Sequence, residues 1–356
     1  MIEKLRANYK GKKVFVTGHT GFKGSWLLAM LKYLGAETKG YALDPDGDPS
    51  LYRLLNGDKL CQSVIADIRN KEKLSKEIHA FQPDFVFHLA AQSLVRVSFD
   101  KPVDTFEVNV MGTNYVLECV REMEKQCSVV VITTDKVYEN RETWDAYKEN
   151  EPLGGFDPYS SSKACAEILT ASYRKSFFAP EMYPYHRKAV ASARAGNVIG
   201  GGDWAKDRII PDLIRALSKH QTLTVRNPDS IRPWQHVLEP LSGYLWLGAH
   251  LQEDPQKYAS AFNFGPMEED NLRVRELVEK SLKIWGSGSF KEQVDPNAPH
   301  EAGILRLDIS KAIFDLAWKP KWNSEKALAM TLNWYKSYKI NPIETTEDQI
   351  AEYFAE

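Results

Sequence analysis

Residues 13–24 read KVFVTGHTGFKG, an apolar run followed at once by a loop with glycines at three-residue intervals. The run has the β-branched and aromatic composition of a buried strand. Gly18, Gly21 and Gly24 permit a tight turn and let backbone N–H groups approach an anion at the start of the next helix. The spacing differs from the G-x-G-x-x-G dinucleotide fingerprint, so the prediction depends on the position of the loop directly after a strand.

An acidic residue follows the next predicted strand, over 38–43. Asp44 lies 20 residues after Gly24, where a carboxylate can accept the ribose hydroxyls of a dinucleotide and repels a 2′-phosphate, so we expect NAD rather than NADP. An ordinary strand-to-helix turn with a loop aspartate is the alternative that the residues leave open. The predicted cofactor contacts in the glycine loop are Gly18, Thr20, Gly21, Phe22, Lys23 and Gly24.

The first half of the chain alternates apolar runs with amphipathic stretches. Apolar strands that alternate with helices are typical of a parallel sheet covered on both faces, so we expect an α/β, Rossmann-like, doubly wound fold. The further strands are predicted over 62–66, 84–89 and 128–133, and the helices over 25–34, 71–80 and 102–125.

The pattern loosens from about residue 187, where short apolar runs alternate with Gly, Arg, Trp and Pro. This composition favours a smaller C-terminal α/β lobe that binds the substrate over the open end of the sheet. We therefore expect a nucleotide-binding domain over 1–190, with roughly 230–260 returning to it, and a substrate lobe over most of 191–356.

Two more loops follow predicted strands of the sheet. Asp67 and Ile68 come after the third strand and are candidates for the adenine edge, although an ordinary loop aspartate explains them too. Leu89, Ala90, Ala91 and Gln92 follow the fourth strand. Their small size would let the backbone pass close to a cofactor, and it could equally reflect packing.

Composition narrows the class of protein. The 356 residues carry a formal net charge of −2, with 43% hydrophobic and 26% charged residues. These values are those of a soluble globular protein and give no electrostatic case for nucleic acid or a membrane as a partner. The N-terminal residues lack the apolar core of a signal peptide, and the four cysteines show no metal-ligand spacing. We expect a cytoplasmic protein with reduced thiols and no metal.

A helix is predicted to begin at Asp157-Pro158, with the aspartate as its cap. Tyr159 and Lys163 then project from one face a turn apart. A nearby ammonium lowers the pKa of a phenol, which makes the pair an acid/base unit for hydride chemistry. The pair alone is a weak signal, since surface Tyr/Lys pairs are common. Thr133 and Thr134 end the fifth strand, and Thr134 offers a hydroxyl to a sugar oxygen beside Tyr159.

Over nearly its whole length the chain resembles the extended branch of the short-chain dehydrogenase/reductase superfamily. The resemblance rests on the glycine loop, residues 89–92, Asn109 with Gly112-Thr113, and the Tyr159-x-x-x-Lys163 motif. It implies that Tyr159 removes a hydroxyl proton as hydride goes to NAD. It also implies that Lys163 binds the ribose and lowers the pKa of the tyrosine, and that Asn109 and Thr133 lie at the cofactor.

Within this branch, residues 134–138 (TDKVY) are similar to the signature of the nucleotide-sugar 4,6-dehydratases. Those acting on dTDP-glucose and GDP-mannose have Glu where this chain has Lys136. The Asp-Lys pair, with residues 200–204, 207–212 and 232–237, resembles dehydratases of CDP-glucose, which feed dideoxysugar synthesis for bacterial surface polysaccharide. An epimerase, or a dehydratase of a dTDP-, UDP- or GDP-sugar, is the alternative.

The resemblance implies a route with three stages. Oxidation at carbon 4 makes the proton at carbon 5 acidic, because it becomes α to a carbonyl. Asp135, protonated, would donate to the departing carbon 6 hydroxyl, Lys136, neutral, would remove the carbon 5 proton, and the hydride would return to carbon 6. A buried Asp/Lys pair can exchange its proton, so the residues leave open which group moves the carbon 5 proton.

A nucleoside diphosphate needs cationic or amide donors, for which guanidinium forks are well suited. The candidates in segments that resemble the substrate loops of the family are Arg96, Asn197, Arg208, Arg215, Arg232 and Arg306. Taken singly, each arginine is more often a surface residue. Two long predicted helices, over 102–125 and 158–178, resemble those that relatives pair into a dimer interface, so we expect a homodimer or homotetramer.

Overall fold

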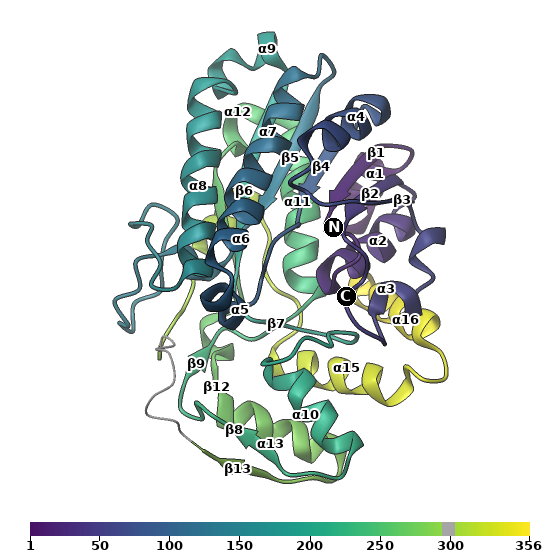
Figure 1. The fold of residues 1–356 in the computed structure, drawn as a ribbon, viewed down its shortest axis with the longest axis vertical. Helices are drawn as coiled ribbons and strands as arrows, with labels where there is room; N and C mark the ends of the chain where they lie inside the picture. Colours follow the sequence, from purple (N-terminus) through teal and green to yellow (C-terminus); the bar gives the residue numbers. More distant parts are fainter. Residues whose placement is uncertain (294–302) are drawn as a thin grey trace.

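The computed structural model describes residues 1–293 and 303–356. Its centre is a parallel sheet of seven strands in the order β11-β6-β5-β4-β1-β2-β3 (Figure 1). The strands are β1 (Lys13–Thr17), β2 (Glu37–Ala42), β3 (Gln62–Ile65), β4 (Phe85–His88), β5 (Cys127–Ile132), β6 (Lys188–Ala195) and β11 (Ala261–Phe264). The strand order reverses at β1, which lies between β2 and β4, so ligands are expected at the carboxyl ends of these strands. The doubly wound Rossmann-like fold is confirmed.

Alternate side chains of each strand enter different cores, as the two-residue period of a strand requires. Val14 and Val16 of β1 pack in one core with Trp26, whereas Phe15 packs in the other with Val116. The first core includes residues of α1 (Ile2–Tyr9), α2 (Phe22–Tyr33) and α11 (Leu238–Glu253). The second includes residues of α4 (Lys71–Phe81) and α7 (Gly112–Glu122). Helices therefore cover both faces, which explains why the central strands β1, β4 and β5 are buried along almost their whole length.

The helix predicted over 102–125 is interrupted. The chain forms α6 (Pro102–Phe106), a π-helical turn η2 (Glu107–Met111) and then α7. A Cβ at Gly112 would lie 3.0 Å from Cγ2 of Ile68, a tight contact, so the absence of a side chain at Gly112 lets the helix approach the loop after β3 closely. Such π-turns often lie at functional sites, and this one contains Asn109.

The smaller lobe lies beyond the carboxyl ends of the strands, because the chain leaves β6 at Ala195 to enter it (Figure 1). Its helices are α10 (Ile209–Ser218), α13 (Val274–Trp285) and α15 (Ser324–Ser337). Short strands pair within or beside it: β7 (Val198–Ile199) with β10 (Gln235–His236), β8 (Leu223–Val225) with β13 (Phe290–Glu292), and β9 (Ile231–Arg232) with β12 (Leu272–Arg273).

The chain crosses between the two parts several times. β6 extends beyond the boundary expected at residue 190, and β11 supplies the edge strand next to it. The last helix, α16 (Pro342–Ala355), packs against α2, where the rings of Phe354 and Tyr33 stack 5.8 Å apart. The nucleotide-binding part therefore includes segments from both ends of the sequence. Every helix in the described ranges is too short or too polar to cross a lipid bilayer.

Candidate active site

The glycine loop packs directly against the loop that follows β4. Gly18 has a φ of 77°, and a Cβ on it would lie 2.8 Å from the backbone nitrogen of Ala90. A Cβ on Gly24 would lie 2.1 Å from the carbonyl oxygen of Gly18. α2 begins directly after Gly21, which offers no side chain to cap it. The first turn of α2 thus presents backbone N–H groups at the switch point of the sheet, which fits the pyrophosphate of a dinucleotide.

Other predicted cofactor residues support this loop. Thr20 donates its hydroxyl hydrogen to the carbonyl of Leu43, 2.8 Å away, and fixes the loop to the end of β2. Asn109 accepts from the backbone nitrogen of Gln92 (2.9 Å) and donates to the hydroxyl of Ser162 (2.8 Å). The amide therefore links residues 89–92 to α8 (Pro158–Ser176). A direct contact of Asn109 with NAD stays a prediction.

Two aspartates lie at the same edge of the sheet. Asp44 follows β2 and is exposed, and Asp67 follows β3, the neighbouring parallel strand. Both oxygens of Asp67 accept from Arg69, whose hydrogen bonds hold the pKa of that carboxyl below its ordinary value. Asp44 is thus available to ribose hydroxyls, whereas Asp67 is already engaged through its side chain. Ile68 is buried and supports Gly112.

Tyr159 and Lys163 lie where the sequence predicts, on the first turns of α8. Asp157 caps this helix by accepting from the backbone nitrogen of Ser160 at 2.9 Å. Both side chains are buried, with relative exposures of 9% for Tyr159 and 5% for Lys163. Lys163 donates to the carbonyl oxygen of Ile132, 3.1 Å away, at the end of β5. The helix face is therefore held against the carboxyl end of the sheet.

The expected lowering of the Tyr159 pKa is not found in this structure. Burial raises the pKa of Tyr159 to about 12, because the phenolate loses its hydration. A hydrogen bond with Thr134 and the guanidinium of Arg208 oppose that rise. Burial also lowers the pKa of Lys163 to about 8, and the carboxylate of Glu167 opposes the fall. Arg208, predicted from sequence as a substrate contact, is therefore a cation that acts on the phenol.

Thr134 caps a short 3₁₀ turn, η3 (Asp135–Val137), directly after β5. Its hydroxyl donates to Oδ1 of Asp135 at 2.9 Å. Asp135 is only 2% exposed, and burial raises the pKa of its carboxyl, whereas the neighbouring Lys136 lowers it. The protonated carboxyl needed by a general acid is thereby favoured. Lys136 is half-buried beside it.

Lys23 extends from the glycine loop toward Asp135, Lys163 and Arg208, whose charges act on it. Its Nζ lies 3.4 Å from the hydroxyl of Tyr244 on α11. Burial and the charge of Arg208 lower the pKa of Lys23 to about 8, while Asp135 raises it. The sequence analysis did not select Tyr244, since it lies in a helix whose buried residues are mostly apolar and no motif distinguishes it.

Arg208 and Arg232 lie near Tyr159 and Asp135, respectively. Arg208 pairs with Asp203 at 2.8 Å. Arg232 is buried, donates to the carbonyl of Gly303 at 3.2 Å, and lowers the pKa of Asp135. A Cβ on Gly196, which precedes Asn197, would lie 3.0 Å from Oδ2 of Asp135. The segment with Asn197 therefore passes directly beside the proposed acid.

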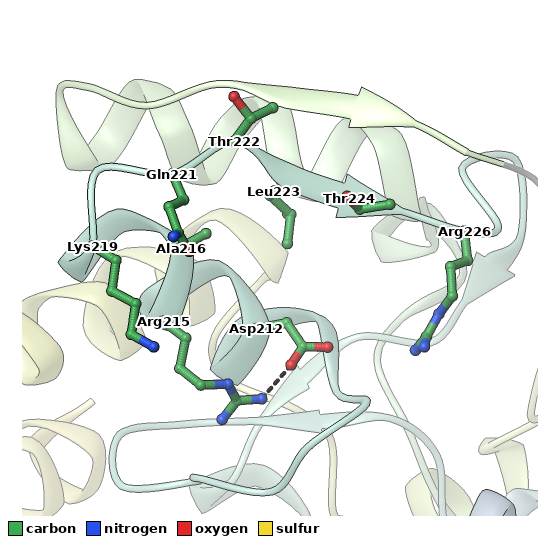
Figure 2. A pocket seen from close by; sticks show the side chains of 9 residues that line it. All are labelled: Asp212, Arg215, Ala216, Lys219, Gln221, Thr222, Leu223, Thr224 and Arg226. Carbon is green, nitrogen blue, oxygen red and sulfur yellow. Dashed lines mark hydrogen bonds and ion pairs between the residues drawn. The ribbon is translucent and has the colours of Figure 1, made fainter.

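Arg215 lies farther along the lobe, at a cavity of about 320 Å³ (Figure 2). It pairs with Asp212 and donates to the carbonyl of Trp204 at 3.0 Å. The cavity is lined by Asp212, Arg215, Ala216, Lys219, Gln221, Thr222, Leu223, Thr224 and Arg226. Arg226, which the sequence analysis missed, pairs with Asp207 at 2.7 Å.

Asp207 also faces Arg96 at 3.7 Å, so one carboxylate connects a residue of α5 (Val95–Asp100) with Arg226 at the cavity. Arg306 is engaged elsewhere: it donates to the carbonyl of Trp144 at 2.8 Å and pairs with Glu268. None of these contacts brings Arg306 to the catalytic cluster, and its role as a substrate contact stays a prediction.

Comparison with known proteins places the chain in a family. The model of the family described as GDP-mannose 4,6 dehydratase matches residues 15–331. The CDP-glucose 4,6-dehydratase of Salmonella typhimurium is 50% identical over 330 residues, which cover 93% of this chain and 92% of that protein. A probable dTDP-glucose 4,6-dehydratase of Sinorhizobium fredii is 25% identical, covering 91% and 92% of the two chains.

The fold is also that of solved dehydratases. The dTDP-glucose 4,6-dehydratase DesIV of Streptomyces venezuelae, with NAD and TYD bound, matches with a TM-score of 0.77 at 23% identity. The match covers 91% of this chain and 97% of that one. The dTDP-glucose 4,6-dehydratase of Bacillus anthracis in complex with NAD has a TM-score of 0.76 at 22% identity, covering 92% and 97%. The chain belongs to the GDP-mannose 4,6 dehydratase family.

Proposed function

We propose that this protein is an NAD-dependent lyase that converts CDP-D-glucose to CDP-4-dehydro-6-deoxy-D-glucose and water. One observation carries the proposal: two proton-handling pairs, Tyr159 with Lys163 and Asp135 with Lys136, meet at the carboxyl end of β5. A simple dehydrogenase or epimerase needs only the first pair. The choice of CDP-glucose is supported by the name of the relative that is 50% identical.

Tyr159 takes the proton of the carbon 4 hydroxyl in the oxidation. Its burial makes the phenolate costly, so the hydrogen bond with Thr134 and the cation of Arg208 are needed to stabilise negative charge there. Bound NAD supplies the acceptor for the hydride of carbon 4 and the donor of the hydride that returns to carbon 6. Gly18 and the uncapped start of α2 hold its pyrophosphate.

Asp135 and Lys136 carry out the elimination. The new ketone makes the carbon 5 proton acidic. Lys136 removes it, and the Lys136 ammonium returns a proton to carbon 5 as hydride reaches carbon 6. Asp135, kept protonated by burial, gives its proton to the carbon 6 hydroxyl as that group leaves as water. Thr134 orients the carboxyl through its hydrogen bond to Oδ1.

The diphosphate and the nucleoside are bound in the smaller lobe. The site runs from Arg208 and Arg232, close to the sugar, past Arg96 and Asp207 toward the cavity of Figure 2. Lys219, Arg215 and Arg226 give the cavity a net positive lining against the single carboxylate of Asp212. This charge suits a nucleoside diphosphate, and Asn197 adds an amide donor beside it.

The protein acts as a homodimer in the cytoplasm, on the route to dideoxysugars of a bacterial surface polysaccharide. Exposed apolar side chains on neighbouring helices support the dimer. They come from α5 (Val95–Asp100), α6, η2 and α8, which pack together, and they are Phe99, Val103, Phe106, Met111 and Ile168. Covering such a patch with a second copy removes apolar surface from water.

A substrate panel tests the proposal. The protein is incubated with NAD and separately with CDP-, dTDP-, UDP- and GDP-glucose, and the alkaline absorbance of a 4-keto-6-deoxy sugar is followed. Product from CDP-glucose supports the assignment, whereas a product that retains its carbon 6 hydroxyl indicates an epimerase. The absence of product with every sugar nucleotide contradicts it.

A further inference from the structure

Three side chains lie a turn apart on one face of α8: Tyr159, Lys163 and Glu167. The first two take part in the proposed chemistry. Glu167 has no part in it, although it is only 2% exposed and carries a carboxylate. A buried carboxylate needs hydrogen bonds and a counter-charge, so its partners show what it holds in place.

Glu167 binds both strands that lie beneath α8. Its Oε1 accepts from the hydroxyl of Thr133 at 2.6 Å. Its Oε2 accepts from the hydroxyl of Ser192 at 2.7 Å and from Nη2 of Arg194 at 2.9 Å. Although burial raises the pKa of Glu167, Arg194 and the two hydroxyls together lower it below its ordinary value, so the group is ionised.

Arg194 continues the network to the other end of η3, the turn that carries Asp135 and Lys136 and is the catalytic turn of the proposed function. Its Nη1 donates to the hydroxyl of Tyr138 at 2.9 Å, and Tyr138 donates in turn to Oδ1 of Asn263 at 2.7 Å. Tyr138 directly follows η3, whereas Thr133 lies just before Thr134. The network therefore forms hydrogen bonds on both sides of the segment that carries Asp135 and Lys136.

Glu167 is also the carboxylate that acts on Lys163 in the described part of the chain. Burial lowers the pKa of Lys163 to about 8, and Glu167 raises it. The other groups near this ammonium cannot replace Glu167. Lys23 is itself repelled by Lys163, and His88 is neutral because burial lowers its pKa to about 3. The remaining neighbour on α8, Tyr159, is a protonated phenol at neutral pH.

We propose that Glu167 is a positioning residue for both chemical steps. Through Thr133 and Arg194 it holds the catalytic turn against α8, and its carboxylate is the counter-charge of Lys163. The identity of the two steps rests on the proposed function. A merely structural role does not require these charges, since a buried ion pair can often be replaced by well-packed apolar residues without loss of stability.

The double variant Glu167→Gln/Arg194→Met tests the proposal, because it removes both charges and leaves neither unpaired. Thermal unfolding establishes that it folds. NAD affinity, measured by calorimetry without substrate, and kcat with CDP-glucose are then followed from pH 6 to pH 10 at intervals of about one unit. Lys163 as the ammonium is expected to bind the ribose of NAD, so NAD affinity falls as pH rises through the Lys163 pKa. The rise of kcat with the Tyr159 phenolate levels off at the same pKa.

In the double variant Lys163 loses the charge that raises its pKa. We expect the alkaline fall of NAD affinity and the levelling of kcat to move to lower pH by about one unit, with kcat at pH 8 reduced on the order of tenfold. The KM for CDP-glucose should change little, because the substrate-lobe contacts are intact. Glu149→Gln is the matched control: this half-buried carboxylate accepts from Asn263 in the same network but does not act on Lys163.

A folded double variant that keeps the wild-type pH dependence of NAD affinity overturns the inference. So does a Glu149→Gln variant whose pH dependence moves equally, because the effect would then belong to the network rather than to Glu167. Failure of the proposed function is distinguishable, since the wild type would bind NAD and yet dehydrate no sugar nucleotide. The calorimetric comparison still decides the role of Glu167 in that case.

Discussion

The hydroxyl of Thr134 donates to Oδ1 of Asp135 at 2.9 Å, while Oδ2 of the same carboxyl has no hydrogen-bond partner within residues 1–293 and 303–356. A buried oxygen without a partner is costly when it is charged, and this cost favours the protonated acid. Oδ2 is the oxygen that faces Gly196 and the segment of Asn197. A proton on Oδ2 would fit the role of general acid that we propose for Asp135.

Replacing Asp135 with Asn removes the acid while keeping its shape. We expect oxidation at carbon 4 to persist and loss of water to slow on the order of 10²–10⁴-fold, the usual contribution of a general acid. Single-turnover absorbance should show NADH that accumulates and does not decay. Rapid loss of the carbon 6 hydroxyl by Asp135→Asn would show that another group protonates it.

Replacing Lys136 with Met tests the removal of the carbon 5 proton. The variant should still oxidise carbon 4, because Tyr159 and Lys163 are untouched, but should lose incorporation of solvent deuterium at carbon 5. Mass spectrometry of the sugar after incubation in deuterated water measures this exchange. If deuterium still enters at carbon 5, Lys136 is not the base, and Asp135 or water removes the proton instead.

The pH dependence of the oxidation step should change when the positive charge of the Arg208 guanidinium is removed. Burial raises the pKa of Tyr159 to about 12 and Arg208 lowers it, so removing that charge raises it further. The phenolate is the base, so activity that depends on it rises with pH. In Arg208→Met we expect this rise at higher pH than in the wild type, with a lower rate at neutral pH. Arg208→Lys, which keeps a charge, should lie between the two, and a rate profile unchanged by the loss of charge would contradict the assignment.

The parallel sheet could be predicted because most strands of the first half are short runs with apolar residues, bounded by Gly, Pro or polar residues. β2 to β5 differ from the predicted ranges only at their ends. The order of the strands and the edge strand β11 were not predicted. The π-helical turn within the helix over 102–125 could not be predicted, and neither could the contact between Gly112 and Ile68, residues far apart in sequence. Local pattern carries no information on such contacts.

Some residues of the site could likewise be predicted from the sequence, and others could not. The motif residues Tyr159, Lys163 and Asp135 are brought together as their spacing and strand-end positions predict. The predicted direction of the Tyr159 pKa was wrong, because the sequence does not show the depth of burial, which raises this pKa more than Thr134 and Arg208 lower it. Tyr244 and Arg226 were missed because they enter the site from segments with no motif of their own.

The close packing of the glycine loop gives a last prediction, on NAD binding. Gly18→Ala places a Cβ 2.8 Å from the nitrogen of Ala90 at a residue whose φ is 77°. A left-handed backbone costs alanine on the order of 1–2 kcal/mol by itself. Gly47→Ala is the matched control, since Gly47 has the same φ of 77° but no atom within 4 Å of the added Cβ.

Both variants should lose stability in thermal unfolding, because the left-handed backbone at each position is strained for alanine. Only Gly18→Ala should also lose NAD affinity in calorimetry, because the loop must move away from Ala90 and from the start of α2 that receives the pyrophosphate. Equal losses of affinity in the two variants would mean that the clash has no effect on the cofactor site. Unimpaired binding by Gly18→Ala would place the pyrophosphate elsewhere than on this loop.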